Sequence, residues 1–292
     1  MPLNAYRVKG FDFKSLFATL QDDLIKQPQF VVGEWQSQKV EMPMRELRNV
    51  SFSMKLPQTA DELATETGAH LPWAEDHFGE RVGGVPLNPS PSEAWWPFAQ
   101  KKAGSTNADH KSEGAAFSHT YPERIWPKLA NGGAGNETRS EYQTHPHHGI
   151  RFSYGDLDDV VRQLSASPNT RQAYLPIWFP EDTGAVGGKR VPCTLGYHFA
   201  IREGKLDITY SMRSTDLLRH FQDDIYLAGR LAQWVVAEIL SYTIVSGYNF
   251  KNPQPDPLVV GELIFHTANL HIFDGDVGMI NYRKSQGLVW NE

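Results

Sequence analysis

Residues 191–224 form the most informative stretch of the chain and read VPCTLGYHFAIREGKLDITYSMRSTDLLRHFQDD. Residues 193–200 and 206–212 are rich in apolar and β-branched side chains, which predicts two strands, and the segment 202–205 with its glycine predicts the turn between them. A long helix is expected from about residue 224 to 241, because apolar residues occupy most of its circumference. Such a helix is buried on most sides. The stretch therefore predicts a β-hairpin followed by a buried helix.

Outward from this stretch, the pattern predicts an α+β fold. Helices are expected over 11–25 and 156–164, and strands over 29–32, 47–54, 173–179, 258–267 and 270–273. Strands do not alternate regularly with helices, which argues against a doubly wound sheet. Loops are expected over 83–92, 101–114 and 130–149. We expect one domain over 1–292, with 101–114 and 130–149 as polar insertions.

The composition limits the class of partner. Of the 292 residues, 40% are hydrophobic and 21% charged, and the net charge is −6, so no basic field favours a nucleic-acid polymer. The single cysteine excludes an intrachain disulfide and multi-cysteine metal sites. No apolar run approaches the roughly 20 residues of a membrane helix, and residues 1–10 lack a signal-peptide pattern. We expect a cytoplasmic protein that binds no membrane, and no metal at the histidines His145, His147 and His148.

Cys193 is the candidate nucleophile. A lone cysteine is usually a small buried hydrophobe. Here Arg213 and Ser214 follow twenty residues later, at the end of the next strand, and antiparallel pairing would return them to the neighbourhood of Cys193. A guanidinium beside a thiol favours the nucleophilic thiolate. Together with the serine hydroxyl, it also suits a phosphate group.

These motifs resemble the thymidylate synthase superfamily. The resemblance covers about 167–273 and rests on Pro192-Cys193, Arg213-Ser214-Thr215-Asp216, the long helix, and Asn269-Leu270-His271-Ile272-Phe273. It implies a thymidylate-synthase-like mixed sheet with a long buried helix, in a homodimer formed through the sheet. Residues 30–52 resemble phage deoxycytidylate hydroxymethylases in particular, so a phage-encoded enzyme in a host cytoplasm would fit.

The resemblance also implies roles for residues elsewhere. Arg171, in the segment Ser167-Pro168-Asn169-Thr170-Arg171, would reach the phosphate site of the partner subunit, and Glu80 would be the catalytic acid or base. The remaining implied residues are Tyr121 and His271 for the nucleotide, Trp95 and Asp216 for folate, and Lys39, Arg45 or Arg48 for a mobile phosphate contact.

The implied reaction begins with addition of the Cys193 thiolate to C6 of a pyrimidine nucleotide, after which C5 takes a one-carbon unit from 5,10-methylenetetrahydrofolate. Glu80 would organise water and move protons. Water added to the resulting exocyclic methylene gives a hydroxymethyl group, whereas hydride gives a methyl group. No metal takes part in this scheme.

Asp224 indicates the base. Relatives that make thymidylate carry an asparagine here, whose amide matches uracil O4 and N3–H. An ionised carboxylate only accepts hydrogen bonds, so it suits the N4 amino group and a protonated N3 of cytosine and repels uracil O4. One unpaired buried polar group costs ~1–3 kcal/mol. Thr194 replaces the histidine usual in thymidylate makers, as in the cytidylate hydroxymethylases.

Alternatives remain open. The residues also fit a deoxycytidylate methyltransferase, a cytidylate hydroxymethylase, a non-catalytic nucleotide-binding relative, or a hydrolase that pairs Cys193 with His271. Asp223 or Asp224 could simply cap the long helix. Departures from the family pattern are Phe273, His198, His220, Gln172 and the segment 287–292.

Overall fold

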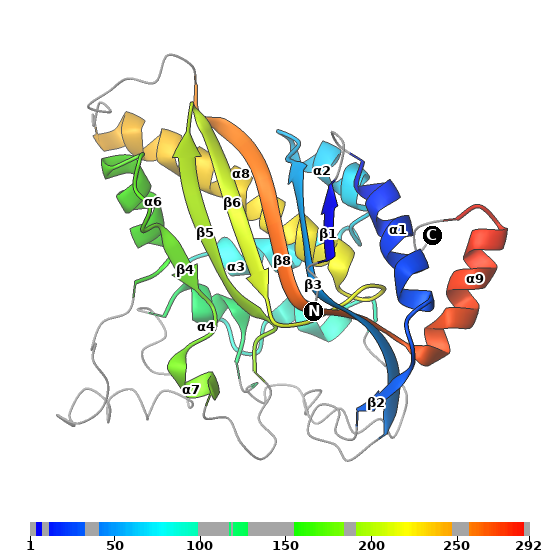
Figure 1. The fold of residues 1–292 in the computed structure, drawn as a ribbon. Coiled ribbons are helices and arrows are strands. Elements are labelled where there is room, and N and C mark those ends of the chain that lie inside the picture. Colours follow the sequence, from blue (N-terminus) through cyan, green and yellow to red (C-terminus); the bar gives the residue numbers. More distant parts are fainter. Residues whose placement is uncertain are drawn as a thin grey trace.

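A single mixed sheet organises the part of the chain that the computed structural model describes, residues 4–7, 12–32, 41–98, 117, 119–127, 155–183, 191–246 and 257–288. The strand order is β1-β3-β8-β6-β5-β4; β2 pairs with β3, and β7 with β8. The β1–β3, β6–β8 and β7–β8 pairs are parallel and the others antiparallel. The predicted α+β class with a mixed sheet is confirmed (Figure 1). The insertions 101–114 and 130–149 lie outside the described residues.

The strands are β1 (Asn4–Arg7), β2 (Phe30–Val32), β3 (Met42–Lys55), β4 (Tyr174–Pro176), β5 (Thr194–Arg202), β6 (Lys205–Met212), β7 (Thr215–Asp216) and β8 (Val259–Phe273). The described helices are α1 (Phe13–Ile25), α2 (Ala60–Thr67), α3 (Trp73–Val82), α4 (Tyr121–Ile125), α6 (Leu157–Ala166), α7 (Pro180–Thr183), α8 (Phe221–Ser246) and α9 (Val277–Ser285). Short 3-10 turns are η1 (Pro91–Trp95) and η2 (Asp274–Asp276).

The predicted β5–β6 hairpin and the helix after it are present. Glu203 and Gly204 both have positive φ, 51° and 73°, which is the geometry of a two-residue turn that matches strand twist. The register shifts between Thr194 and Gly196, so the strand start beside Cys193 is irregular. Helix α8 begins at Phe221, three residues earlier than expected.

The two strands predicted over 258–267 and 270–273 are one strand, β8, so that division was wrong. β8 lies in the middle of the sheet, antiparallel to β3 on one side and parallel to β6 on the other. Asn269, at the position where the sequence predicted the strand to end, pairs in register with Arg48 of β3. Ladder pairing on both edges therefore outweighs the weak strand propensity of this short polar segment.

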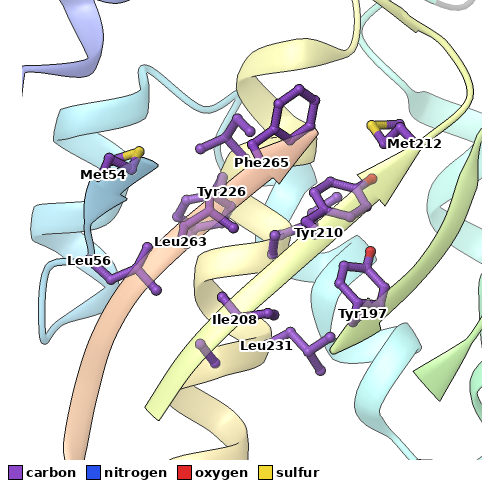
Figure 2. Packing of buried hydrophobic residues seen from close by; sticks show 14 of the residues in the cluster. Met54, Leu56, Tyr197, Ile208, Tyr210, Met212, Tyr226, Leu231, Leu263 and Phe265 are labelled. Atoms are coloured by element: carbon purple, nitrogen blue, oxygen red, sulfur yellow. The ribbon is translucent and has the colours of Figure 1, made fainter. Parts of the chain in front are cut away.

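Helix α8 packs behind the sheet and forms the core with it (Figure 1). Figure 2 shows Tyr210 of β6 and Phe265 of β8 among the buried side chains between these strands and α8. The rings of Tyr197 and Tyr210 stack with centroids 4.7 Å apart. This packing fixes the strand ends beside Cys193. Within the described ranges, no helix has the length and apolar content to span a membrane.

Candidate active site

Cys193 and Arg213 lie together at the open end of the β5–β6 hairpin. Cys193 immediately precedes β5 and Arg213 immediately follows β6. Arg213 Nη2 is 3.6 Å from the half-buried Cys193 Sγ, and the Arg213 backbone N–H donates to the Cys193 carbonyl over 2.9 Å. Arg213 Nε also donates to the Pro192 carbonyl at 2.8 Å. The guanidinium is therefore held beside the thiol, an arrangement that favours the thiolate.

A row of hydroxyl groups borders this pair. Thr194 Oγ1 lies 3.0 Å from Tyr121 Oη and 2.9 Å from Tyr210 Oη, which joins α4 to β5 and β6. Burial raises the pKa of the Tyr121 phenol, and negative charge on Cys193 raises it further. Tyr121 therefore stays neutral, and a thiolate at Cys193 acts on it electrostatically. We call Tyr121, Thr194 and Tyr210 the hydroxyl row.

Asp224 reaches the same region from the first turn of α8. Thr215 Oγ1 donates to Asp224 Oδ2 at 2.7 Å. Burial raises the pKa of Asp224 above its usual value, although the charge of His220, the Thr215 hydrogen bond and the charge of Arg81 each lower it. Negative charge on Asp224 in turn raises the pKa of Tyr121 and Tyr210. The charge of Asp224 therefore acts on two phenols of the hydroxyl row.

The neighbouring carboxylate of Asp223 accepts from the backbone N–H of His70 at 2.9 Å and lies 3.0 Å from His70 Nδ1. These bonds tie α8 to the segment before α3 rather than capping α8 itself. Asp223 and Asp224 thus have different partners, on different segments of the chain.

Ser214 and His271 meet through the pairing of β7 with β8. Ser214 Oγ lies 3.3 Å from His271 Nδ1, and Asn269 Oδ1 lies 3.1 Å from the same nitrogen. Burial lowers the pKa of His271, so its imidazole is neutral and can bind a hydroxyl group. The three polar side chains predicted from two separate motifs form one group.

Glu80 and Trp95 line a cavity of about 510 Å³ between α3 and the turn η1. Its apolar lining is Val85, Leu87, Pro91 and the 41% exposed Trp95, and its carboxylates are Glu75, Asp76 and Glu80. Glu80 accepts from the Ser92 backbone N–H at 2.7 Å and from the hydroxyls of Ser90 and Ser92. Although burial raises its pKa, hydrogen bonds from His77, Ser90 and Ser92 lower it to about 2.

His77 and Arg81, which the sequence did not single out, connect this cavity to the hydroxyl row. His77 Nδ1 is 2.7 Å from Ser92 Oγ, and its Nε2 is 2.9 Å from Arg81 Nη2. The Arg81 guanidinium lies 4.0 Å from the centroid of the Tyr121 ring. Their spacing of four residues is a helical signal, but no helix was expected over residues 73–82.

Other predicted site residues have different surroundings. Arg171 is exposed, and its carbonyl lies 3.2 Å from His198 Nε2. The buried carboxylate of Asp216 binds the backbone N–H of Leu218 and Arg219, and the Arg219 guanidinium. Asp216 is thus held by its own chain, and its contact with a pterin stays a prediction.

The basic residues predicted for a mobile phosphate contact separate clearly. Arg45 binds Asp274 at 2.8 Å and the carbonyls of Ile25 and Gln27, so its half-buried guanidinium already has partners within the fold. Arg48 is exposed, and Lys39 lies outside the described residues. The three clustered histidines also lie outside them, and the described part of the chain contains no group of side chains suited to a metal ion.

The fold is that of thymidylate synthase, and Cys193 lies directly before strand β5. Residues 124–243 match the family described as thymidylate synthase. This match confirms the predicted resemblance to the thymidylate synthase superfamily over these residues. The match includes Cys193, Arg213 and Asp224, whereas Glu80, Trp95 and His271 lie outside it.

Individual relatives extend this result. The chain is 25% identical over 139 residues to a putative thymidylate synthase of Methanothermobacter thermautotrophicus, which covers 47% of this chain and 51% of that protein. It is 41% identical over 70 residues to the deoxyuridylate hydroxymethyltransferase of Bacillus phage SP01, covering 23% and 18%. The chain thus spans about half or less of the curated relatives it matches. Thermostable thymidylate synthase A from Bacillus subtilis shares the fold, with a TM-score of 0.56 and 15% identity over 95% of this chain and 84% of that one.

Proposed function

We propose that this protein is a one-carbon transferase that hydroxymethylates C5 of dCMP, with 5,10-methylenetetrahydrofolate as the one-carbon donor. The observation that carries the choice of base is the carboxylate of Asp224, which Thr215 holds and whose charge, like that of Cys193, acts on Tyr121. The superfamily match supports the class of reaction. The phage relative supports a hydroxymethyl product.

Cys193 is the proposed nucleophile. Its thiolate, stabilised by Arg213 at 3.6 Å, adds to C6 of the pyrimidine, and this addition raises the electron density at C5. C5 then takes up the one-carbon unit; loss of the C5 proton and departure of tetrahydrofolate, with cleavage of its carbon–nitrogen bond, leave an exocyclic methylene on C5. Addition of water to that methylene yields the hydroxymethyl group, and expulsion of the thiolate restores the ring.

Asp224 is the proposed base reader. As an ionised carboxylate it accepts from the N4 amino group and from a protonated N3 of cytosine, and a protonated N3 makes C6 more electrophilic. Uracil would direct its O4 acceptor at the same carboxylate. An unpaired buried polar group costs ~1–3 kcal/mol, which is enough for roughly tenfold to hundredfold selection.

The phosphate and the sugar fit the remaining groups. Arg213 and Ser214 supply a cation and a hydroxyl for the phosphate, and neutral His271 beside Ser214 suits a sugar hydroxyl. Arg171 is proposed to bind the phosphate of a partner subunit in a homodimer. Half-exposed side chains alternate with core residues along β5 and β6, as expected of a sheet face that a second subunit covers.

The cavity beside Glu80 and Trp95 fits folate. Its apolar lining suits a planar aromatic ring, its carboxylates can accept from pterin N–H donors, and its volume of about 510 Å³ is in the range of small-molecule sites. Folate supplies the one-carbon unit when bound. With a pKa of about 2, Glu80 is ionised in the free protein and acts there as a hydrogen-bond acceptor that orders water.

The second candidate is hydroxymethylation of dUMP, because the phage SP01 relative is described as a deoxyuridylate hydroxymethyltransferase. The two candidates differ only in the base that Asp224 accepts. Methylation of dCMP and hydroxymethylation of CMP use the same cysteine.

Mass spectrometry of the nucleotide products tests the proposal, with dCMP, dUMP and CMP in competition and methylenetetrahydrofolate present. We expect dCMP to gain about 30 Da, whereas a methyltransferase would add about 14 Da. Preference for dUMP would overturn the role of Asp224, and no product from any nucleotide would favour a binding protein.

Three variants assign the residues. Cys193→Ser should abolish product formation, and Asp224→Asn should move the preference toward dUMP. Asp223→Asn is the matched control, because Asp223 pairs with His70 instead. It should keep the preference for dCMP.

A further inference from the structure

Buried His77 lies between Arg81 and the hydrogen bonds of Glu80. Only 3% of its surface is exposed, and the indole of Trp73 stacks on its ring, with centroids 4.9 Å apart and an angle of 15° between the planes. His77 Nε2 lies 2.9 Å from Arg81 Nη2, and His77 Nδ1 lies 2.7 Å from Ser92 Oγ. Both ring nitrogens therefore have a partner, and the stacked indole fixes the plane in which they point.

His77 has one ring proton to place on its two nitrogens. Burial, and then the charge of Arg81, lower the pKa of His77, so the imidazole is neutral. In a neutral imidazole one nitrogen donates and the other accepts. A guanidinium has donors only, so Arg81 Nη2 donates and His77 Nε2 accepts. The proton of His77 is therefore on Nδ1.

This tautomer sets the direction of the next two hydrogen bonds. With its proton on Nδ1, His77 donates to Ser92 Oγ, and the Ser92 hydroxyl donates its own proton to Glu80. The reverse tautomer would make Nδ1 an acceptor that competes with Glu80 for the Ser92 proton. Glu80 also accepts from the Ser90 hydroxyl and from the Ser92 backbone N–H. Three donors thus orient its carboxylate, and one of them depends on the tautomer of His77.

Arg81 is suited to fix this tautomer because its own position is fixed. Only 7% of its surface is exposed, and its guanidinium lies 4.0 Å from the centroid of the Tyr121 ring. Arginine keeps its proton at every working pH, so the donor at Nη2 is permanent. Tyr121 Oη in turn lies 3.0 Å from Oγ1 of Thr194, the residue after Cys193. One guanidinium therefore contacts the nucleotide half of the site through Tyr121 and the folate half through His77.

We propose that Arg81 is a positioning residue that fixes the tautomer of His77 and, through Ser92, the orientation of the Glu80 carboxylate. Each link from Arg81 to Glu80 is a direct hydrogen bond. The inference rests on the proposed function, in which Glu80 orders water beside the folate. Because Arg81 acts through Glu80, its loss should lower kcat and leave the KM for dCMP unchanged.

Nitrogen NMR of the free protein measures the tautomer without turnover. The protonated and unprotonated nitrogens of a neutral ring differ in chemical shift, and His77→Gln identifies the signals of this ring among those of eleven isotope-labelled histidines. We expect the Nδ1–H form in the wild type and in Arg81→Lys, which keeps a donor, and the Nε2–H form to gain in Arg81→Met. Arg124→Met is the matched control, because buried Arg124 also stacks on a ring, that of Phe179, but pairs with Asp182. It should keep the Nδ1–H form.

Steady-state kinetics with dCMP and methylenetetrahydrofolate test the consequence for Glu80. Arg81→Met should lower kcat by about tenfold to hundredfold, within what general acid–base catalysis contributes, whereas Arg81→Lys should retain it. Ser92→Ala should lower kcat to a similar extent while His77 keeps its Nδ1–H form. Because both changes interrupt the same hydrogen-bond chain, the double variant should be no slower than the slower single variant.

Two results of NMR would overturn the role of Arg81: a wild type with the His77 proton on Nε2, and an unchanged tautomer in Arg81→Met. Losses in kcat that multiply in the double variant would also overturn it, since Arg81 would then act independently of Ser92. A wild type that is inactive would instead refute the proposed function, and the NMR comparison would still decide whether Arg81 fixes the tautomer of His77.

Discussion

Replacement of Glu80 by glutamine removes a carboxylate that the fold holds in its ionised form. Hydrogen bonds from His77, Ser90 and Ser92 lower its pKa from the usual 4.5 to about 2, against the effect of burial. At about 1.4 kcal/mol per pKa unit, this lowering sets a ceiling of about 3 kcal/mol on its stabilisation of the folded state. The side chain is 14% exposed, which reduces the ceiling through solvent screening. We therefore expect Glu80→Gln to lower the free energy of unfolding by about 2 kcal/mol at pH 7.

The pH dependence has a definite sign. A carboxyl group with a depressed pKa stabilises the folded state fully above its unfolded pKa, and this stabilisation disappears as the pH falls through the folded value. The difference between wild type and Glu80→Gln should thus shrink from about pH 5 to about pH 2. Urea unfolding followed by tryptophan fluorescence measures it. Glu93→Gln, in the adjacent turn η1, is the control. Equal stability at pH 7, or a difference that persists in acid, would refute the reasoning.

Two further predictions concern stability. Gly79→Ala should stabilise α3 by about 0.5–1 kcal/mol, because nothing lies within 4 Å of the added Cβ. Gly229→Ala should destabilise the protein by about 1–2 kcal/mol, because its Cβ would lie 2.6 Å from a buried leucine, and thermal melting of both variants checks these opposite signs. Arg219→Met should lower the free energy of unfolding by about 3 kcal/mol, because it leaves buried Asp216 without its cation. Lys26→Met, which removes one partner of an exposed ion pair, should lower it by less than about 0.5 kcal/mol. Similar midpoints of urea unfolding for the two variants would contradict this prediction.

The elements that the sequence predicts best are those with a strong local pattern. The β5–β6 hairpin has its glycine turn, and α8 has an apolar circumference that few alternatives fit. The sequence pattern did not predict helix α3, because the polar side chains of buried His77 and Arg81 interrupt its apolar face. β1 is a four-residue strand that exists through pairing with β3, and no local signal marks it.

For the site, strand ends were the reliable guide. Cys193 and Arg213 lie together because the antiparallel pairing of β5 with β6 brings the end of β6 back to the start of β5. The spacing of twenty residues between Cys193 and Arg213 predicts this return. Asp216 pairs locally with Arg219, three residues later, whereas the contact of Arg219 with Asp276, which is distant in the sequence, has no local signal. Arg81 was missed for a similar reason, since its contact with Tyr121 joins two helices separated by a long polar segment.

The central position of β8 has a consequence for biosynthesis. β8 is the last strand of the described chain, yet it separates β3, an early strand, from β6. While the ribosome is still translating residues before 259, β3 and β6 each have an edge without its final neighbour. Closure of the sheet must wait until β8 has left the exit tunnel, because β3 and β6 gain this shared neighbour only through late, non-local contacts. The nascent chain therefore depends on its own final strand, or on a chaperone, to cover these edges.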